Sequence, residues 1–153
     1  YGNLGFARTS AGHHEASLDA LRQGLELAPQ GLALHFTCAR NLAALGRMDE
    51  ARAEIAREGN AIYRLLGEAL ILEGPDSDRA LRELIDRHSK DGPAQIAEAY
   101  AVRGDVENAF AWIERAKNEP DPGTILIPSE PNFRSLHGDR RWAEFLRWLG
   151  LDS

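Results

Sequence analysis

The sequence predicts an all-α protein, an α-α superhelix of about four helical hairpins closed by a C-terminal capping helix. Two observations predict this fold class. Over residues 96–116, apolar and small side chains recur every three or four positions on either side of Gly104, as in two amphipathic helices joined by a tight turn. The same pattern recurs along the chain, and the first two turn glycines, Gly12 and Gly46, are 34 residues apart. Such a hairpin cannot bury its apolar stripe alone, so we expect neighbouring copies to stack.

Four copies of the hairpin are predicted, at about residues 1–32, 33–60, 61–90 and 91–118. The second helix of each copy carries a small residue followed four positions later by a large apolar one. The small residue lets the partner helix approach, and the large residue fills the space beside it. These pairs are Ser17 and Leu21, Ala51 and Ile55, Ala80 and Leu84, and Ala109 and Ile113.

The connections between helices are predicted from glycine, proline and capping residues. A turn glycine can adopt the left-handed conformation that ends a helix. Gly46 and Gly74 are only 28 residues apart, so the second helix of the second copy should be short and end near Gly59. We expect Asp76 or Ser77 to cap the helix after Gly74, and Pro93 to occupy a first helical turn.

The C-terminal residues 119–153 are predicted to form a loop followed by the capping helix. Residues 118–132 contain four of the seven prolines, which indicates a loop; these are Pro120, Pro122, Pro128 and Pro131. Asp139 should open the capping helix. Its apolar side chains recur at intervals of three and four, at Trp142, Phe145, Leu146 and Leu149.

Composition limits the function classes. A length of 153 residues allows one domain with a substantial core. The net charge of −6 argues against a nucleic-acid partner, since such binding usually begins with a basic surface. No apolar run approaches the roughly 18 residues of a membrane span, and no secretory signal opens the chain. We therefore expect no membrane insertion and a cytoplasmic location.

The hairpins resemble the tetratricopeptide repeat (TPR) family. The run Tyr63-x2-Leu66-Gly67-x2-Leu70-x3-Gly74 matches the first half of its pattern, and Tyr1-x2-Leu4-Gly5 matches the beginning. The resemblance covers residues 1–117 and implies a single TPR domain over residues 1–153. Because the chain opens inside a repeat, we interpret it as a fragment of a longer protein. Residues 121–151 resemble the tail of TPR arrays in bacterial regulatory proteins, where the array is often joined to a winged-helix, cyclase or kinase domain.

The TPR resemblance implies a concave groove that holds a protein or peptide. The groove-facing residues by the family register are Phe6, Thr9, Phe36, Arg40, Arg64, Glu68, Ile71, Glu98 and Val102. A solvated face with incidental apolar residues is the alternative interpretation. The positions that clamp a chaperone's terminal carboxylate in some TPR domains hold Gly2, Phe6, Thr37 and Leu65 here, so a chaperone tail is not expected.

No pattern in the chain indicates catalysis, a metal or a cofactor. His13 and His14 have no further ligand placed by the repeat. His35 and Cys38 share a helical face, but Cys38 occupies the core position of Leu4 and Leu66. The predicted function is therefore protein or peptide binding, as the docking or sensory part of a larger bacterial regulator. The alternatives are self-association as a homo-oligomeric structural module and, less favoured, an enzyme on a helical-repeat scaffold.

Overall fold

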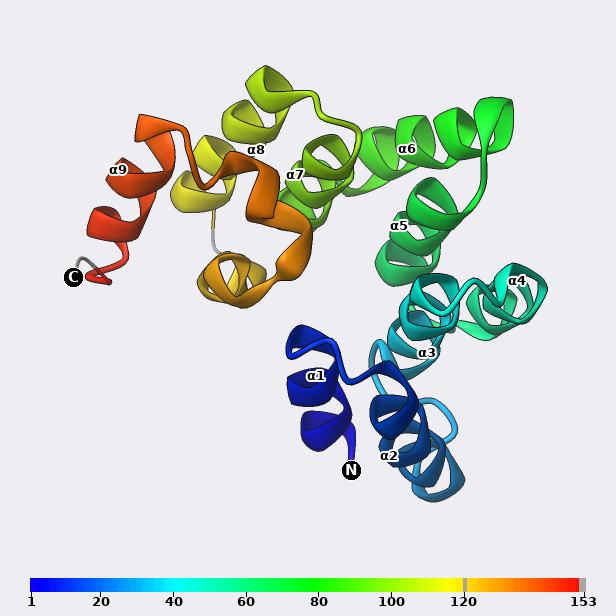
Figure 1. Ribbon diagram of the computed structural model, residues 1–153. Helices are drawn as coiled ribbons and strands as arrows, with labels where there is room; N and C mark the ends of the chain where they lie inside the picture. The colour runs from blue at the N-terminus through cyan, green and yellow to red at the C-terminus, as the bar shows by residue number, and fades with distance from the viewer. Residues whose placement is uncertain (120, 152–153) are drawn as a thin grey trace. The chain divides into compact units, whose positions relative to one another are not determined.

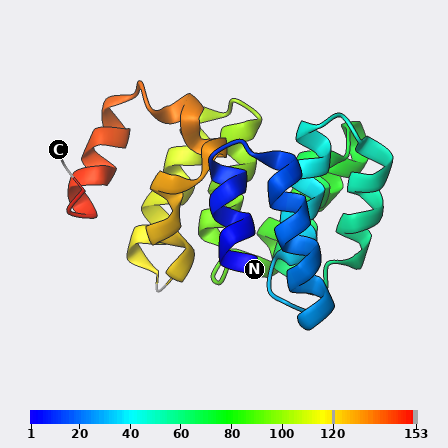
Figure 2. The ribbon, with the colours of Figure 1, turned by 60° about the horizontal axis from the view of Figure 1, so that its bottom comes forward.

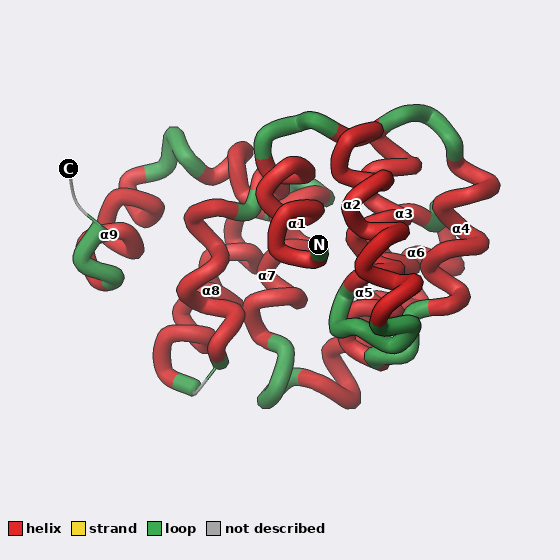
Figure 3. The backbone as a smooth tube through the Cα atoms, turned by 90° about the horizontal axis from the view of Figure 1, so that it is seen from below, coloured by secondary structure: helices red, strands yellow, loops and turns green. Residues whose placement is uncertain are grey.

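The computed structural model describes residues 1–119 and 121–151, and Pro120 of the predicted loop lies outside them. The described residues form helices and turns and contain no β-strand (Figures 1 and 3). The all-α class predicted from sequence is confirmed. No helix in this part of the chain is long and apolar enough to cross a membrane.

Eleven helices succeed one another along the described residues. The nine α-helices are α1 (Gly2–Ser10), α2 (His14–Leu27), α3 (Leu34–Ala44), α4 (Met48–Arg57), α5 (Ala61–Ile71), α6 (Gly74–His88), α7 (Pro93–Val102), α8 (Val106–Asn118) and α9 (Arg140–Trp148). Two 3₁₀ helices, η1 (Pro122–Ser129) and η2 (Pro131–Leu136), lie between α8 and α9. Short turns join α1 to α2, α3 to α4 and α7 to α8, and each of these pairs packs closely as a hairpin (Figure 2).

The chain divides into two compact units, Tyr1–Arg82 and Glu83–Ser153. The first contains α1 to α5 and the start of α6, and the second contains the end of α6 and the helices that follow. The predicted third hairpin, α5 with α6, therefore does not lie within one unit. A continuous superhelix over residues 1–153 stays a prediction.

Glycine in the left-handed conformation closes each predicted turn. The φ angles are +77° at Gly12, +76° at Gly46, +56° at Gly74 and +75° at Gly104. A Cβ at such a backbone angle is crowded by the neighbouring carbonyl, so glycine is favoured where one helix ends and the next begins. The predicted role of these four glycines is confirmed.

The small and large pairs of the second helices lie in the core, as predicted. All eight side chains are buried, from Ser17 and Leu21 on α2 to Ala109 and Ile113 on α8. Contact is closest where a first helix offers glycine. A Cβ added to Gly5 would lie 2.5 Å from Leu21, and one added to Gly67 would lie 1.9 Å from Ile55. The small and large pairs thus mark the places where two helices cross. There the large aliphatic side chain of the second helix contacts the backbone of the first.

The ends of the helices agree with the sequence at most positions. Helix α4 ends at Arg57, close to the predicted end, and Pro93 is the first residue of α7. The prediction that Asp76 or Ser77 caps α6 is wrong. Helix α6 already begins at Gly74, and the Ser77 hydroxyl donates a hydrogen bond to the carbonyl oxygen of Ala69 at 2.6 Å. That bond joins α6 to α5.

The prediction of a loop over residues 118–132 is wrong, because η1 and η2 occupy most of it. Each 3₁₀ helix has proline at its first position and an acidic residue before it whose side chain accepts from a backbone N–H. Proline fits the first turn of a helix, where its missing N–H leaves no bond unmade. Thus two of the prolines that suggested a loop, Pro122 and Pro131, are helix starts here, and Pro128 lies within η1.

Helices η1, η2 and α9 complete the core of the second unit. Trp142 and Phe145 are buried, and Leu146 and Leu149 pack partly buried beside them, as predicted for the last helix. Asp139 caps it by accepting from the backbone N–H of Arg141 at 2.9 Å. The buried cluster comprises Ala94, Ala97, Ala101, Ala109, Phe110, Ile113, Ala116, Ile127, Phe133, Leu136, Trp142 and Phe145.

Candidate partner-binding surface

The nine residues predicted to face a groove are divided between the two units. Seven lie on α1, α3 and α5 of the first unit, and Glu98 and Val102 lie on α7 of the second. Within the first unit α1 lies beside α3, and α3 beside α5. These first helices therefore form a continuous row, as the repeat register requires. The side chains on that row differ in exposure, and this decides which of them a ligand could reach.

Thr9 is buried in a polar network and does not face solvent. Its hydroxyl contacts that of Ser17 at 2.8 Å and donates to the carbonyl oxygen of Gly5 at 3.0 Å. The side-chain amide of Asn41 donates to Thr9 and to the carbonyl oxygen of Thr37, both at 2.8 Å. His14 completes the network through its Nδ1, 2.8 Å from Oδ1 of Asn41. Thr9 thus joins α1, α2 and α3 and is withdrawn from contact with a ligand.

Phe36 is also buried, beneath Tyr63 and Arg40. Its ring centroid lies 5.4 Å from that of Tyr63, and the Arg40 guanidinium carbon lies 5.4 Å from the centre of the Phe36 ring. Arg40 is half-buried and forms the outer layer of this stack. Stacking on an aromatic ring orients the planar guanidinium of an arginine.

The buried carboxylate of Glu58, which the sequence patterns did not identify, holds the start of α3 in place. Glu58 is buried and accepts from the backbone N–H groups of Phe36 and Asn60, each at 3.0 Å. Phe36 is in the first turn of α3, whose N-cap residue, Ala33, provides no side-chain cap. Glu58, which follows α4, therefore caps the N-terminus of α3, where the helix dipole favours a negative charge. No local motif predicts a cap supplied from 22 residues away.

The three predicted residues on helix α5 differ in exposure. Arg64 is exposed, and Glu68 is half-buried with its carboxylate 3.7 Å from the Arg79 guanidinium. Ile71 is buried. On α1, Phe6 is half-buried. The first unit thus combines a half-buried aromatic ring, two arginines and a carboxylate on its row of first helices, namely Phe6, Arg40, Arg64 and Glu68, which we call the groove set.

In the second unit the corresponding face of α7 is covered by the chain itself. Asn132 on η2 donates from its side-chain amide to Oε1 of Glu98 at 2.7 Å. Further along α7, the carbonyl oxygen of Ala101 accepts a hydrogen bond from the Ser135 hydroxyl at 3.2 Å. Glu98 is buried as a result, while Val102 remains exposed. Of the two predicted groove residues here, only Val102 remains open to a ligand.

Asp121 anchors the beginning of this covering segment. One carboxylate oxygen accepts from the backbone N–H of Ala94 at 3.0 Å, in the first turn of α7, and the other from that of Gly123 at 2.7 Å. Asp121 thus caps α7 much as Glu58 caps α3. Ala101 does not face an open groove, because it is 2% exposed and lies within the core. This face of α7 carries only small side chains, those of Ala94, Ala97 and Ala101. Helices η1 and η2 can therefore pack closely on it.

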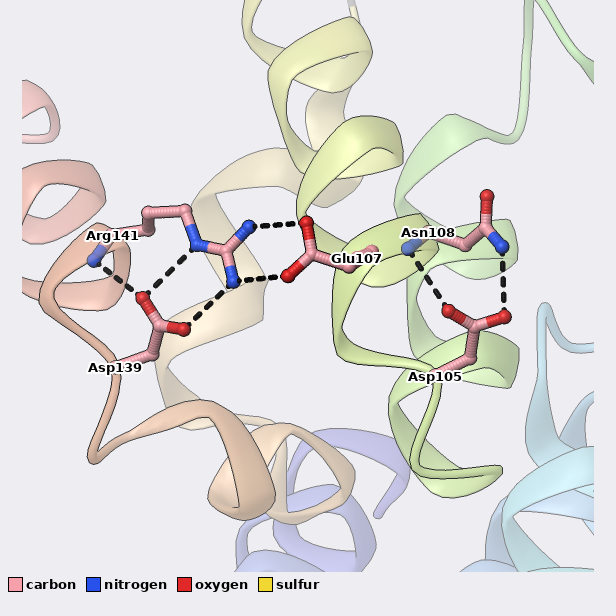
Figure 4. A network of polar contacts seen from close by, with 5 residues as sticks. All are labelled: Asp105, Glu107, Asn108, Asp139 and Arg141. Carbon is pink, nitrogen blue, oxygen red and sulfur yellow. Dashed lines mark hydrogen bonds and ion pairs between the residues drawn. The ribbon is translucent and has the colours of Figure 1, made fainter.

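A charged network lies at the start of α9 (Figure 4). The Arg141 guanidinium donates to Asp139 at 2.8 and 3.0 Å and to Glu107 on α8 at 2.9 and 3.0 Å, and it lies over the Phe110 ring. Its hydrogen bonds lower the pKa of Asp139 to about 2 and lower that of Glu107. Asp105 separately caps α8 through Asn108. The network ties α9 to α8 rather than forming an open anion site.

Two histidines contact carboxylates, and the cysteine lies in the core. The His35 ring nitrogen lies 2.7 Å from Glu54, and His88 contacts Asp91. No group of three potential metal ligands occurs among the described residues. Cys38 is in the core, and burial, together with the charge of Glu54, raises its pKa to about 12. It is therefore protonated at neutral pH, and the prediction that Cys38 is a core residue is confirmed.

Comparison with protein-family models, with curated proteins and with solved structures gave no match. The chain is thus assigned by its own structure to the all-α class.

Proposed function

We propose that the chain is a TPR-like scaffold that binds a protein or peptide partner across the groove set of its first unit. The observation that carries the proposal is the repeat register. Four turn glycines adopt positive φ, and the four small and large pairs that follow them are buried. In the first unit α1 packs with α2 and α3 packs with α4 as hairpins, and α5 follows them. Helix α3 lies between α1 and α5, so equivalent positions of these three helices lie on one row.

The chemistry of the groove set supports a ligand that carries both apolar and charged groups. Phe6 offers an aromatic contact, Arg40 and Arg64 offer positive charge, and Glu68 offers a carboxylate. A short peptide or an amphipathic helix with a large apolar anchor and a few charged side chains matches this mixture better than a uniformly charged polymer. Aromatic and arginine residues also carry most of the binding energy in protein interfaces.

The proposed site is confined to the first unit because the face of α7 is already filled. A ligand would have to remove Asn132 from Glu98 and expose Phe133 and Leu136, which are buried. The resemblance to the tails of bacterial regulatory TPR arrays supports a docking or sensory role within a larger cytoplasmic protein. The buried Cys38 thiol, whose pKa is raised to about 12, does not favour nucleophilic catalysis at this position.

The proposal is tested by selecting peptides from a random display library on the folded chain and measuring their affinity by calorimetry. Arg40→Ala and Arg64→Ala should each weaken a selected peptide about 5- to 30-fold, equivalent to ~1–2 kcal/mol, with little loss of folding stability. Arg82→Ala is the matched control, since Arg82 is exposed on α6. Peptides whose affinity depends on Arg82 and not on the groove set would contradict the proposal.

A further inference from the structure

One position of the repeat recurs on the first helix of every hairpin, six residues before each turn glycine. Its occupants, which we call the row positions, are Phe6 on α1, Arg40 on α3, Glu68 on α5 and Glu98 on α7. The first three belong to the groove set, and the fourth belongs to the second unit. The residue type thus changes from helix to helix while its place in the repeat stays the same.

The row position of the second unit shows how a chain segment lying on a first helix is bound. Helix η2 packs on α7, and the side-chain amide of its Asn132 donates to Oε1 of Glu98 at 2.7 Å. Glu98 is 7% exposed beneath it. The covering segment thus meets α7 with a hydrogen-bond donor that matches the carboxylate at the row position.

Glu68 places the same carboxylate at the row position of α5. Its side chain is 21% exposed, and its carboxylate lies 3.7 Å from the Arg79 guanidinium, which is longer than a hydrogen bond. Because a carboxylate can accept several hydrogen bonds, Glu68 can accept one from a ligand and keep its ion pair with Arg79. The matching ligand group is a side-chain amide, as in Asn132, or an ammonium group.

Arg40 and Phe6 match different ligand groups. The Arg40 guanidinium lies over the Phe36 ring, which orients its plane. A planar guanidinium pairs best with a carboxylate, which it can bind through two parallel hydrogen bonds. Phe6 is half-buried and offers an aromatic surface to an apolar side chain. From α1 to α5 the row positions therefore match an apolar group, a carboxylate and a hydrogen-bond donor.

The separation of the first helices sets the spacing of these groups along a ligand. Helix α3 packs against α1 and against α5, and the axes of packed helices lie about 8–10 Å apart. A peptide in the polyproline II conformation rises about 3.1 Å per residue and has about three residues per turn. Every third side chain then lies on the same side of the peptide, about 9 Å from the previous one. Successive row positions thus match residues three apart in an extended peptide.

We propose that the partner of the groove set is an extended peptide with an apolar residue, an acidic residue and an asparagine, glutamine or lysine at intervals of about three residues. The apolar side chain lies on Phe6, the carboxylate binds Arg40, and the amide or ammonium group donates to Glu68. This inference rests on the proposed function and narrows the mixed ligand described there to one order of side chains.

Peptide selection on charge-reversed variants tests this order. A random display library is panned on the folded wild-type chain, on Arg40→Glu and on Glu68→Lys. Peptides selected on the wild type should carry the proposed order. Arg40→Glu should select a basic residue in place of the acidic one, and Glu68→Lys should select an acidic residue in place of the donor. Arg82→Glu is the control, since Arg82 is exposed on α6 outside the row positions, and it should leave the selected order unchanged.

Two milder variants keep the test decisive if a charge reversal lowers the melting temperature. Arg40→Gln and Glu68→Gln should each weaken a peptide selected on the wild type about tenfold, as measured by calorimetry, because each removes one charged hydrogen-bonding group. An unchanged affinity for both variants would overturn the inference.

The proposed function and this inference fail in different ways. A library that yields no peptide dependent on the groove set would overturn the proposed function, and this inference with it. Peptides that need the groove set but carry the same charges when selected on Arg40→Glu and Glu68→Lys would overturn this inference alone. A selected spacing of about seven residues, two turns of a helical ligand, would do the same.

Discussion

Asn132 on η2 and Glu98 on α7 are joined by a 2.7 Å hydrogen bond between segments 34 residues apart. Glu98 is buried, so its carboxylate has exchanged hydration for this contact. A buried polar group that loses its hydrogen-bond partner is costly, so this contact matters more than one at the surface. The pair fixes η2 on the face that the repeat register assigns to ligands.

Asn132→Ala should therefore destabilise the protein by ~1–3 kcal/mol, because it removes a donor from a buried carboxylate. The free energy of unfolding in urea measures the effect. Asn118→Ala is the matched control, since Asn118 makes its side-chain hydrogen bond to Glu114 on an exposed surface. Its cost should stay within about 0.5 kcal/mol. Equal costs for the two variants would show that the contact with Glu98 does not hold η2 in place.

Gly67→Ala should destabilise the protein by ~1–3 kcal/mol through overpacking. The added methyl would overlap the Cδ1 atom of Ile55, 1.9 Å away. Gly138→Ala is the control, because nothing lies within 4 Å of its Cβ position and its φ is not positive. Combining Gly67→Ala with Ile55→Val should recover part of the loss, since contacting residues are coupled. Strictly additive costs in the double variant would contradict a direct contact.

Ala101→Leu and Ala109→Leu should both be destabilising, each by ~1–3 kcal/mol. Both alanines lie in the core of the second unit, Ala101 on α7 and Ala109 on α8. Ala111→Leu on the exposed side of α8 is the control and should be nearly neutral. Thermal unfolding of the three variants ranks them. A neutral Ala101→Leu would indicate that α7 faces an open groove after all.

The charge of Asp139 should stabilise the fold in a pH-dependent manner. Hydrogen bonding to Arg141 lowers the pKa of Asp139 from 3.8 to about 2 in the folded state. Because the folded pKa is the lower one, the stabilisation is complete above about pH 4 and disappears as the pH falls towards 2. Wild type should thus be more stable than Asp139→Asn at pH 5, and the difference should shrink on acidification. Asparagine keeps the capping oxygen, so the comparison isolates the charge. A difference that is constant down to pH 2 would exclude this role for the ion pair.

The sequence predicted those parts of the molecule that depend on local patterns. Glycines at φ near +75° and the buried pairs at four-residue spacing leave a direct imprint on the chain, and both were found where expected. The open or closed state of the predicted groove could not be predicted in this way. It depends on contacts between distant segments, such as Glu58 with Phe36 and Asn132 with Glu98. The prolines of residues 122–136 were misinterpreted because proline is common both in loops and in first helical turns.

The central claim, that a peptide partner binds across α1, α3 and α5 of the first unit, is tested most directly by chemical-shift mapping. A peptide selected on the folded chain would be titrated into ¹⁵N-labelled protein. The account predicts that the largest amide shifts lie around Phe6, Arg40, Arg64 and Glu68, with residues 122–136 unchanged because that segment stays packed on α7. Shifts concentrated on α2 and α4, or release of residues 122–136 from α7, would contradict it.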